Sequence, residues 1–140
     1  MSRTIESVAI IGAGTMGAGI AAASAAAGCR VLILDMDAAS VEAALEQVDV
    51  EFRHLVTTGL VDSDLDAVAE YDWICEAIVE DLSIKRELFT RLEAARSDGS
   101  VISSNTSGIP LWQISEDMPE RFCSDVAITH FFNPVRVMKL

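Results

Sequence analysis

Basic residues are scarce in this sequence. Its 140 residues include 10 lysines and arginines against 22 aspartates and glutamates, which gives a formal net charge of −12 at pH 7. This charge is repelled by a nucleic-acid backbone and by an anionic membrane surface, so we expect neither as the main partner. The negative net charge does not exclude phosphate ligands, because the backbone N–H groups at a helix N-terminus can bind phosphate without any basic patch.

Cysteine is also sparse and its pattern indicates no cross-link. The three residues Cys29, Cys75 and Cys123 are far apart and odd in number. No Cys-x-x-Cys pair is present, so the pattern favours neither a zinc site nor a disulfide framework, and we expect no metal. A reducing compartment, and hence a cytoplasmic location, is the expectation. Cys75 lies in an apolar run and is interpreted as a small buried hydrophobic residue rather than a nucleophile.

No segment has the composition of a membrane anchor. The uncharged run from Ser7 to Cys29 is long enough to cross a bilayer. Alanine and glycine dominate it, however, and both are poor anchors beside leucine, isoleucine and phenylalanine.

With 51% hydrophobic residues, the chain can form one domain with a sizeable core and is too short for two.

The first 35 residues predict a strand, a glycine-rich turn, a helix and a second strand. Residues 7–11 form a continuous apolar run, typical of a strand buried on both faces of a parallel sheet. Residues 15–27 are rich in alanine and are closed by Gly28, which is a helix with a glycine stop signal. A second apolar run, 31–34, ends at Asp35.

The alternation of strands and helices continues to the end of the chain. Ser40 is expected to cap an amphipathic helix that carries Val41, Leu45, Val48, Phe52 and Leu55 and ends at Gly59. After an acidic loop with a helical turn at 62–70, we expect strands at 73–75, 100–103 and 126–129, a helix at 82–96 with Ile84, Leu88 and Leu92 on one face, and a short helix at 111–114. This order indicates a doubly wound α/β domain with a mostly parallel sheet and helices on both faces.

The turn after the first strand carries a phosphate-binding pattern. Residues 12–17 read Gly-Ala-Gly-Thr-Met-Gly, with Thr15 and Met16 between the last two glycines. In such a turn Gly12 permits the tight bend, Gly14 lets a pyrophosphate approach the backbone, and Gly17 lets helix and strand pack closely. Asp35 ends the next strand, where the adenosine ribose hydroxyls of a dinucleotide would be held. The nearby base, Arg30, precedes that strand, so no partner for a 2′-phosphate is expected and NAD is favoured over NADP.

Four segments together resemble one family. The glycine turn, Glu76 to Asp81 (Glu-Ala-Ile-Val-Glu-Asp), Asn105 to Ser107 (Asn-Thr-Ser) and His130 to Pro134 (His-Phe-Phe-Asn-Pro) follow the order of the 3-hydroxyacyl-CoA dehydrogenase family, and Val137 to Leu140 continue the match. The resemblance covers essentially the whole chain and is weakest from Asp37 to Glu70. It implies a Rossmann-type NAD-binding domain over residues 1–140, a role in fatty acid metabolism, and oxidation of a 3-hydroxyacyl-CoA to the 3-ketoacyl-CoA.

The resemblance also implies roles for individual residues. His130 would be the general base. A histidine suits this role because its side chain titrates near neutrality, and His130 follows a predicted strand. Ser107 would bond the substrate oxygen and border the cofactor, and Asn133 would lie at the junction of cofactor and substrate. Glu80 and Lys85 would contact the ribose and nicotinamide side. Glu76 has a position similar to that of Glu80, and spacing alone does not separate their roles.

The sequence departs from the family in two respects. A glutamate beyond the Met-Lys-Leu segment would orient His130, and a helical second domain would complete the acyl pocket and form a homodimer. Neither lies within residues 1–140, so we expect this chain alone to be weakly active or inactive. The segment 37–70 is shorter than the family's excursion that helps to hold CoA, which leaves two alternatives: a dehydrogenase of a non-thioester 3-hydroxy acid, and a non-catalytic NAD-binding module.

Overall fold

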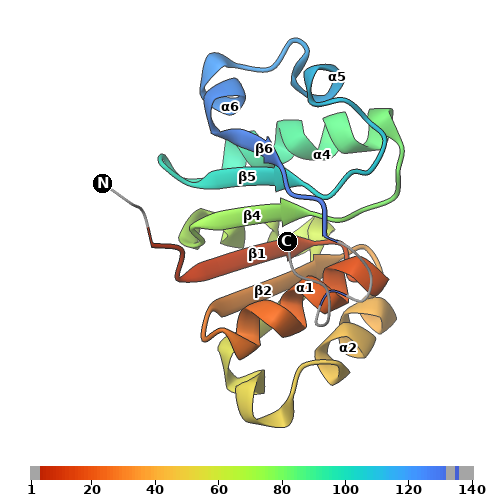
Figure 1. The fold of residues 1–140 in the computed structure, drawn as a ribbon, viewed down its shortest axis with the longest axis vertical. Coiled ribbons are helices and arrows are strands. Elements are labelled where there is room, and N and C mark those ends of the chain that lie inside the picture. Colours follow the sequence, from red (N-terminus) through yellow and green to blue (C-terminus); the bar gives the residue numbers. More distant parts are fainter. Residues whose placement is uncertain (1–3, 132–134, 136–140) are drawn as a thin grey trace.

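The computed structural model describes residues 4–131 and 135, and a parallel sheet runs through its middle (Figure 1). The apolar runs form the inner strands, as a sheet buried on both faces requires. The strands are β1 (Ser7–Ile11), β2 (Arg30–Asp35), β3 (Val56–Leu60), β4 (Trp73–Glu76), β5 (Val101–Ser104) and β6 (Val126–Ile128). Their order is β3-β2-β1-β4-β5-β6 and every pairing is parallel.

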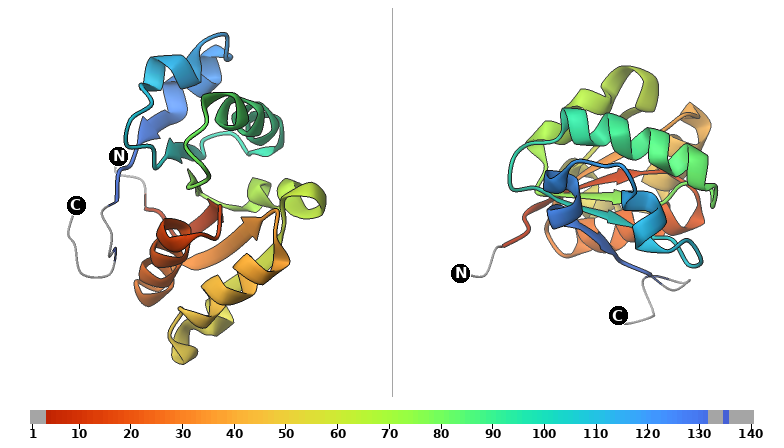
Figure 2. Two further views of the ribbon diagram at one scale, coloured as in Figure 1. Left: turned by 90° about the vertical axis from the view of Figure 1, so that its right-hand side faces the viewer. Right: turned by 90° about the horizontal axis from the view of Figure 1, so that it is seen from above.

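Helices cover both faces of the sheet, as Figure 2 shows from the side. One core cluster lies between the sheet and α1 (Thr15–Ala26) with α2 (Ala38–Glu46). The opposite cluster lies under α3 (Val61–Asp64), the 3-10 helix η2 (Leu65–Glu70), α4 (Leu82–Ala95), α5 (Leu111–Ser115) and α6 (Glu120–Asp125). The expected doubly wound α/β architecture is therefore confirmed.

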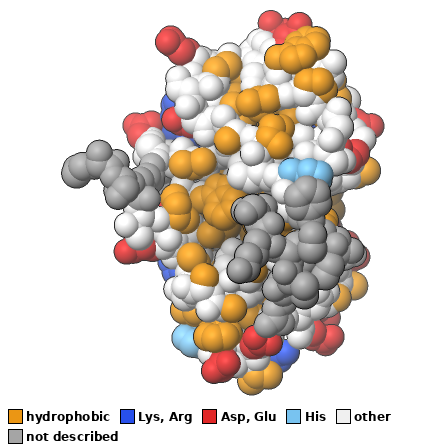
Figure 3. All heavy atoms as spheres, viewed as in Figure 1, with side chains coloured by type: hydrophobic (Ala, Val, Ile, Leu, Met, Phe, Trp, Pro, Cys, Tyr) orange, Lys and Arg blue, Asp and Glu red, His pale blue; other side chains and the backbone are white. Residues whose placement is uncertain are grey.

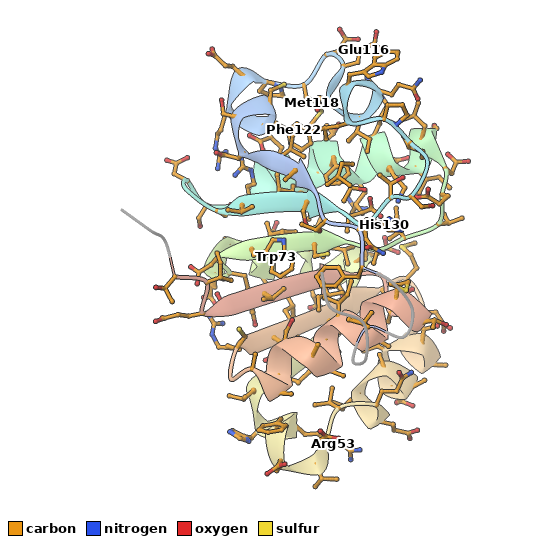
Figure 4. The ribbon with its side chains drawn as sticks, viewed as in Figure 1. Arg53, Trp73, Glu116, Met118, Phe122 and His130 are labelled. Atoms are coloured by element: carbon orange, nitrogen blue, oxygen red, sulfur yellow. The ribbon has the colours of Figure 1, made fainter. Side chains whose placement is uncertain are left out.

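The predicted helix from Ser40 to Gly59 is wrong at both ends. Asp37 caps α2 instead, because its carboxylate accepts the Ala39 N–H at 3.2 Å and the Ser40 hydroxyl at 2.9 Å. The helix stops at Glu46, where the Arg53 guanidinium, labelled in Figure 4, donates to the carbonyls of Glu46 and Val48 at 3.0 Å each. A 3-10 helix, η1 (Val50–Leu55), follows it.

Gly59 lies inside β3 and ends no helix. The run Val56-Thr57-Thr58 is β-branched, which suits an extended backbone, and it pairs with β2 from Val31↔Val56 onward. Three of the five residues of β3 are exposed, so this edge strand lacks the apolar run that reveals the inner strands.

Helix α6 was not predicted. It buries one residue, Phe122, so its sequence shows no helical spacing of apolar residues. The Phe122 ring meets Phe89 of α4 edge to face, with 5.5 Å between centroids. Arg96, at the end of α4, donates to Asp125 of α6 at 2.8 Å and to Glu93 at 2.5 Å. Helix α4 itself turns Leu88 and Leu92 inward as predicted, whereas Ile84 is 47% exposed.

Acidic side chains outnumber basic ones on the face shown in Figure 3, and hydrophobic side chains gather over β4 and β5. Trp73 of β4 belongs to this region and stacks on Phe131, with ring centroids 6.2 Å apart. Among the residues that the structure describes, no helix is long and apolar enough to cross a membrane.

Candidate active site

The strand order places a crevice at the carboxyl ends of β1 and β4. The chain leaves β1 toward α1 on one face of the sheet and leaves β4 toward α4 on the other. Open α/β sheets bind their ligands at such a reversal of strand order. The glycine turn and the segment after Glu76 form the two sides of the crevice.

The glycine turn leaves room for a ligand at one of its three glycines. Gly12 has a φ of +111°, and a Cβ there would lie 2.4 Å from the Ala77 carbonyl oxygen. A Cβ on Gly17 would lie 1.7 Å from the Gly12 carbonyl oxygen. Nothing lies within 4 Å of a Cβ built on Gly14, which is the N-cap residue of α1, and no side chain among the described residues caps that helix. The open space and the uncapped N–H groups fit a pyrophosphate.

The Asp35 side chain, at the end of β2, lies against the glycine turn. One carboxylate oxygen accepts the Ala13 N–H at 2.7 Å, and the other accepts the Asp37 N–H at 3.1 Å. The acid predicted to hold the ribose is thus fixed beside the glycine turn.

A first pocket of about 590 Å³ extends from this turn to α4. Gly12, Gly14 and Asp35 line one side, and Val61, Ile78 and Leu88 are among the apolar residues of the other. Three of its lining residues, Met36, Val79 and Ile84, rank among the exposed large hydrophobic residues of the chain. An apolar, open rim of this kind suits a planar base such as adenine.

A second pocket of about 350 Å³ adjoins the first, because Ala77 and Ile78 line both. Its other lining residues are Met16, Glu80, Asn105, Ser107, His130 and Phe131. The structure therefore brings together four residues singled out in the sequence: Met16, Glu80, Ser107 and His130. Thr15 and Lys85 line neither pocket, and Asn133 lies outside the described residues.

Two hydrogen bonds donated by backbone N–H groups fix the chain on either side of His130, which follows β6 (Figure 4). The N–H of Thr129 donates to the Ser104 carbonyl at 3.0 Å, and the N–H of Phe131 donates to the Asn105 side-chain oxygen at 2.8 Å. Asn105 is a positioning residue that sequence reasoning missed. Its place in the Asn-Thr-Ser segment was the available signal, but no role followed from the sequence.

Burial separates the two glutamates that spacing did not. Glu76 is fully buried, and its carboxylate accepts hydrogen bonds from Lys85 at 2.6 Å, Ser104 at 2.5 Å and the Ile78 N–H at 2.8 Å. Glu80 has a side chain that is 44% exposed and lines the second pocket. Glu76 therefore holds the strand ends together, while Glu80 faces the pocket.

Lys85 connects these two carboxylates from a buried position. Its Nζ lies 3.1 Å from Glu80 in addition to the bond with Glu76. Burial alone would raise the pKa of Glu80, but the hydrogen bond from Thr106 and the hydrogen bond and charge of Lys85 outweigh it, so the pKa is lowered. Glu80 is thus held as a carboxylate at neutral pH, with the Thr106 hydroxyl 2.8 Å from its second oxygen.

Comparison with known proteins identifies the family. The model of the 3-hydroxyacyl-CoA dehydrogenase NAD-binding domain matches residues 7–140. The chain belongs to this family. NAD is accordingly the cofactor of the domain, in agreement with the glycine turn and Asp35.

Individual relatives agree with this assignment. A probable 3-hydroxyacyl-CoA dehydrogenase of Deinococcus radiodurans is 38% identical over 97% of this chain and 44% of its own length. Another, of Bacillus subtilis, is 32% identical over 170 positions that include all of this chain and 22% of the relative. Because this chain has 140 residues, at least 30 of those 170 positions have no counterpart in it.

A solved structure gives the same result. The 3-hydroxybutyryl-CoA dehydrogenase of Escherichia coli K12 matches with a TM-score of 0.86 and 30% identity over 98% of this chain and 32% of that one. The chain thus spans less than half the length of these three proteins.

Proposed function

We propose that the protein oxidises the 3-hydroxyl group of an acyl-CoA to a 3-keto group, with NAD as the hydride acceptor, and catalyses the reverse reaction. The observation that carries this proposal is the second pocket. It gathers His130, Ser107 and Glu80 at the carboxyl edge of the sheet, and it adjoins the pocket of the glycine turn and Asp35. A dinucleotide held by its adenosine end in the first pocket would extend toward His130.

In the proposed reaction His130 acts as general base on the substrate hydroxyl. An imidazole is suited to this because it titrates near neutrality, and the hydrogen bonds of Thr129 and Phe131 fix its backbone. The Ser107 hydroxyl would donate to the substrate oxygen as that oxygen loses its proton. When bound, NAD would supply the hydride acceptor for the hydrogen on the carbon that bears this hydroxyl.

Glu80 and Lys85 are proposed to serve the cofactor in different ways. Glu80 faces the pocket as a carboxylate and would accept hydrogen bonds from the nicotinamide ribose. Lys85 is 1% exposed, and its contact with Glu80 favours a positioning role over direct contact. By family resemblance, Asn133 would complete the junction of cofactor and substrate.

We further propose that residues 1–140 are the NAD-binding domain and that a helical second domain completes the acyl pocket and forms a homodimer. The partial coverage of the relatives supports this arrangement. We propose a cytoplasmic location, consistent with three cysteines that are all free thiols.

A second candidate is a dehydrogenase of a non-thioester 3-hydroxy acid. The 37–70 segment, expected from the sequence to be shorter than the family's CoA-holding excursion, would hold CoA less well, which favours this candidate. On this alternative the roles of His130 and Ser107 would be unchanged.

The proposal is tested in a version that carries the second domain, by NADH formation from 3-hydroxybutyryl-CoA and from free 3-hydroxybutyrate, with the His130→Ala variant as control. Oxidation of the thioester that is lost in the variant supports the main proposal. Oxidation of the free acid alone supports the second candidate. Cofactor binding with no oxidation of either substrate would leave the non-catalytic module.

A further inference from the structure

The first pocket contains an arginine that the sequence did not place there. Arg91 of α4 lines the same pocket as Gly14 and Asp35. Arg30, the base nearest to Asp35 in the sequence, lies at the opposite end of β2, where it pairs with Ser7 at the start of β1. The sequence pointed only to Arg30 as a nearby base, whereas the fold brings a second base, Arg91, to the pocket that Asp35 lines.

The guanidinium of Arg91 reaches the edge of the sheet at which Asp35 lies. Its Nη2 donates to the Val61 carbonyl at 3.3 Å. Val61 directly follows Leu60, which is the register partner of Asp35 in the β2–β3 ladder. Parallel neighbouring strands lie about 4.8 Å apart, so the guanidinium is anchored one residue beyond the position opposite Asp35.

The other charges of this pocket are acidic. Glu87, one turn before Arg91 on α4, lines it together with Asp35. The Asp35 carboxylate accepts two backbone N–H bonds, and Arg91 is the basic residue among the described residues that line the pocket. Arg91 is thus the cation of the pocket, held by one long hydrogen bond to a backbone carbonyl.

We propose that Arg91 is a determinant of cofactor specificity: it is a latent 2′-phosphate partner, and Asp35 alone prevents its use. With adenine against Met36, Val79 and Ile84, the adenosine ribose would lie between the carboxylate of Asp35 and the guanidinium of Arg91. A free 2′-hydroxyl donates to Asp35. A 2′-phosphate is repelled by Asp35, although the planar fork of a guanidinium is well suited to bind it.

This inference rests on the proposed role of the first pocket as the adenosine site. The test measures dissociation constants for NADH and NADPH by calorimetry at one ionic strength, so it does not depend on turnover. In the Asp35→Asn variant the charge is removed while a side-chain oxygen remains to accept the Ala13 N–H. We expect NADPH to bind this variant about tenfold or more tightly than it binds the unmodified chain, since Arg91 can then engage the phosphate.

Adding Arg91→Leu to Asp35→Asn should remove that gain, and Arg91→Lys should retain part of it as a point charge. The matched control is Asp35→Asn with Arg30→Leu. It also removes one positive charge, but at the start of β2, and it should keep the gain in NADPH affinity. Urea unfolding of each variant shows that it is folded.

Two results would overturn the proposal: no gain in Asp35→Asn, or a gain that persists when Arg91 is leucine. Loss of the gain in the Arg30 control would also overturn it, because net charge would then explain the effect. If the unmodified chain binds neither NADH nor NADPH, the assignment of the pocket to the cofactor is wrong. This outcome differs from the results above, in which NADH still binds and only the role of Arg91 is wrong.

Discussion

Replacing Lys85 by methionine tests whether the buried ion pair holds the strand ends together. The Lys85 and Glu76 side chains are 1% and 0% exposed, and their charged atoms lie 2.6 Å apart. Methionine keeps most of the aliphatic stem, so little packing is lost, but the Glu76 carboxylate remains buried without its cation. Removing one partner of a buried pair typically costs about 3–5 kcal/mol. Glu76 would retain the hydrogen bonds from Ile78 and Ser104, so we expect the lower end, about 3 kcal/mol.

The assay is urea unfolding near pH 7, with Glu76→Gln/Lys85→Met as the second arm. The double variant has no buried charge at these two positions and should recover at least about 1 kcal/mol of the free energy of unfolding. Arg86→Met is the matched control on the same helix. Its ion pair with Glu116 is partly exposed, at 3.9 Å, and it also donates to the Gln113 carbonyl at 2.6 Å, so its loss should cost about 2 kcal/mol or less. A cost of Lys85→Met no larger than that of the control would refute the reasoning.

The same variant has a consequence for pH dependence. The pKa of Glu80 lies below its ordinary value of 4.5 in the folded chain, so its stabilising contribution is present above that value and is lost as pH falls through the folded pKa. Lys85 is one of the causes of this lowered pKa. We therefore expect Lys85→Met to raise the pKa of Glu80 and to weaken the loss of stability on acidification.

Further expected outcomes concern single side chains. Asp35→Ala should weaken NADH binding by about 1–3 kcal/mol, and the unmodified chain should prefer NADH to NADPH; equal affinity would contradict the ribose assignment. In a version that carries the second domain, His130→Ala should lower turnover by about 10²–10⁴ with little change in the dissociation constant for NADH, whereas a change confined to KM would indicate a binding histidine. A thiol reagent at pH 8 should label exposed Cys123 rapidly; Cys75, whose pKa burial raises to about 11, should react only after unfolding. Gly14→Ala should cost about 1 kcal/mol of stability or less, because alanine is a poorer N-cap residue than glycine, yet weaken NADH binding roughly tenfold, and normal NADH affinity would show that no phosphate approaches there.

The inner strands could be predicted because burial on both faces demands an apolar run. Segments 7–11 and 31–34 satisfy that demand in the sequence itself. Strand β3 could not be found in this way, since an edge strand needs no such run and its threonines are exposed. The apolar spacing from Val41 to Leu55 then suggested one helix, although Arg53 binds the carbonyls at which α2 ends.

The candidate site could be predicted where its residues follow strand ends. His130 follows β6, and Ser107 and Glu80 lie a few residues beyond β5 and β4. Parallel strands bring these positions to one edge of the sheet, so their convergence follows from strand order. The position of Arg91 does not follow from strand order, because it depends on how far a side chain in the third turn of α4 reaches under the sheet edge.

The three glycines of the turn show how far packing alone explains a sequence pattern. Gly12 and Gly17 are required by the protein's own atoms, because a Cβ at either position would overlap a backbone oxygen. Gly14 meets no such atom, so packing does not exclude a Cβ there, although glycine is preferred to alanine as the N-cap residue of α1. Packing alone therefore does not require a glycine at this position. On the proposed function, a pyrophosphate that approaches the uncapped N–H groups of α1 would supply a further reason, and it would connect the turn to Asp35 on one side and to the pocket of His130 on the other.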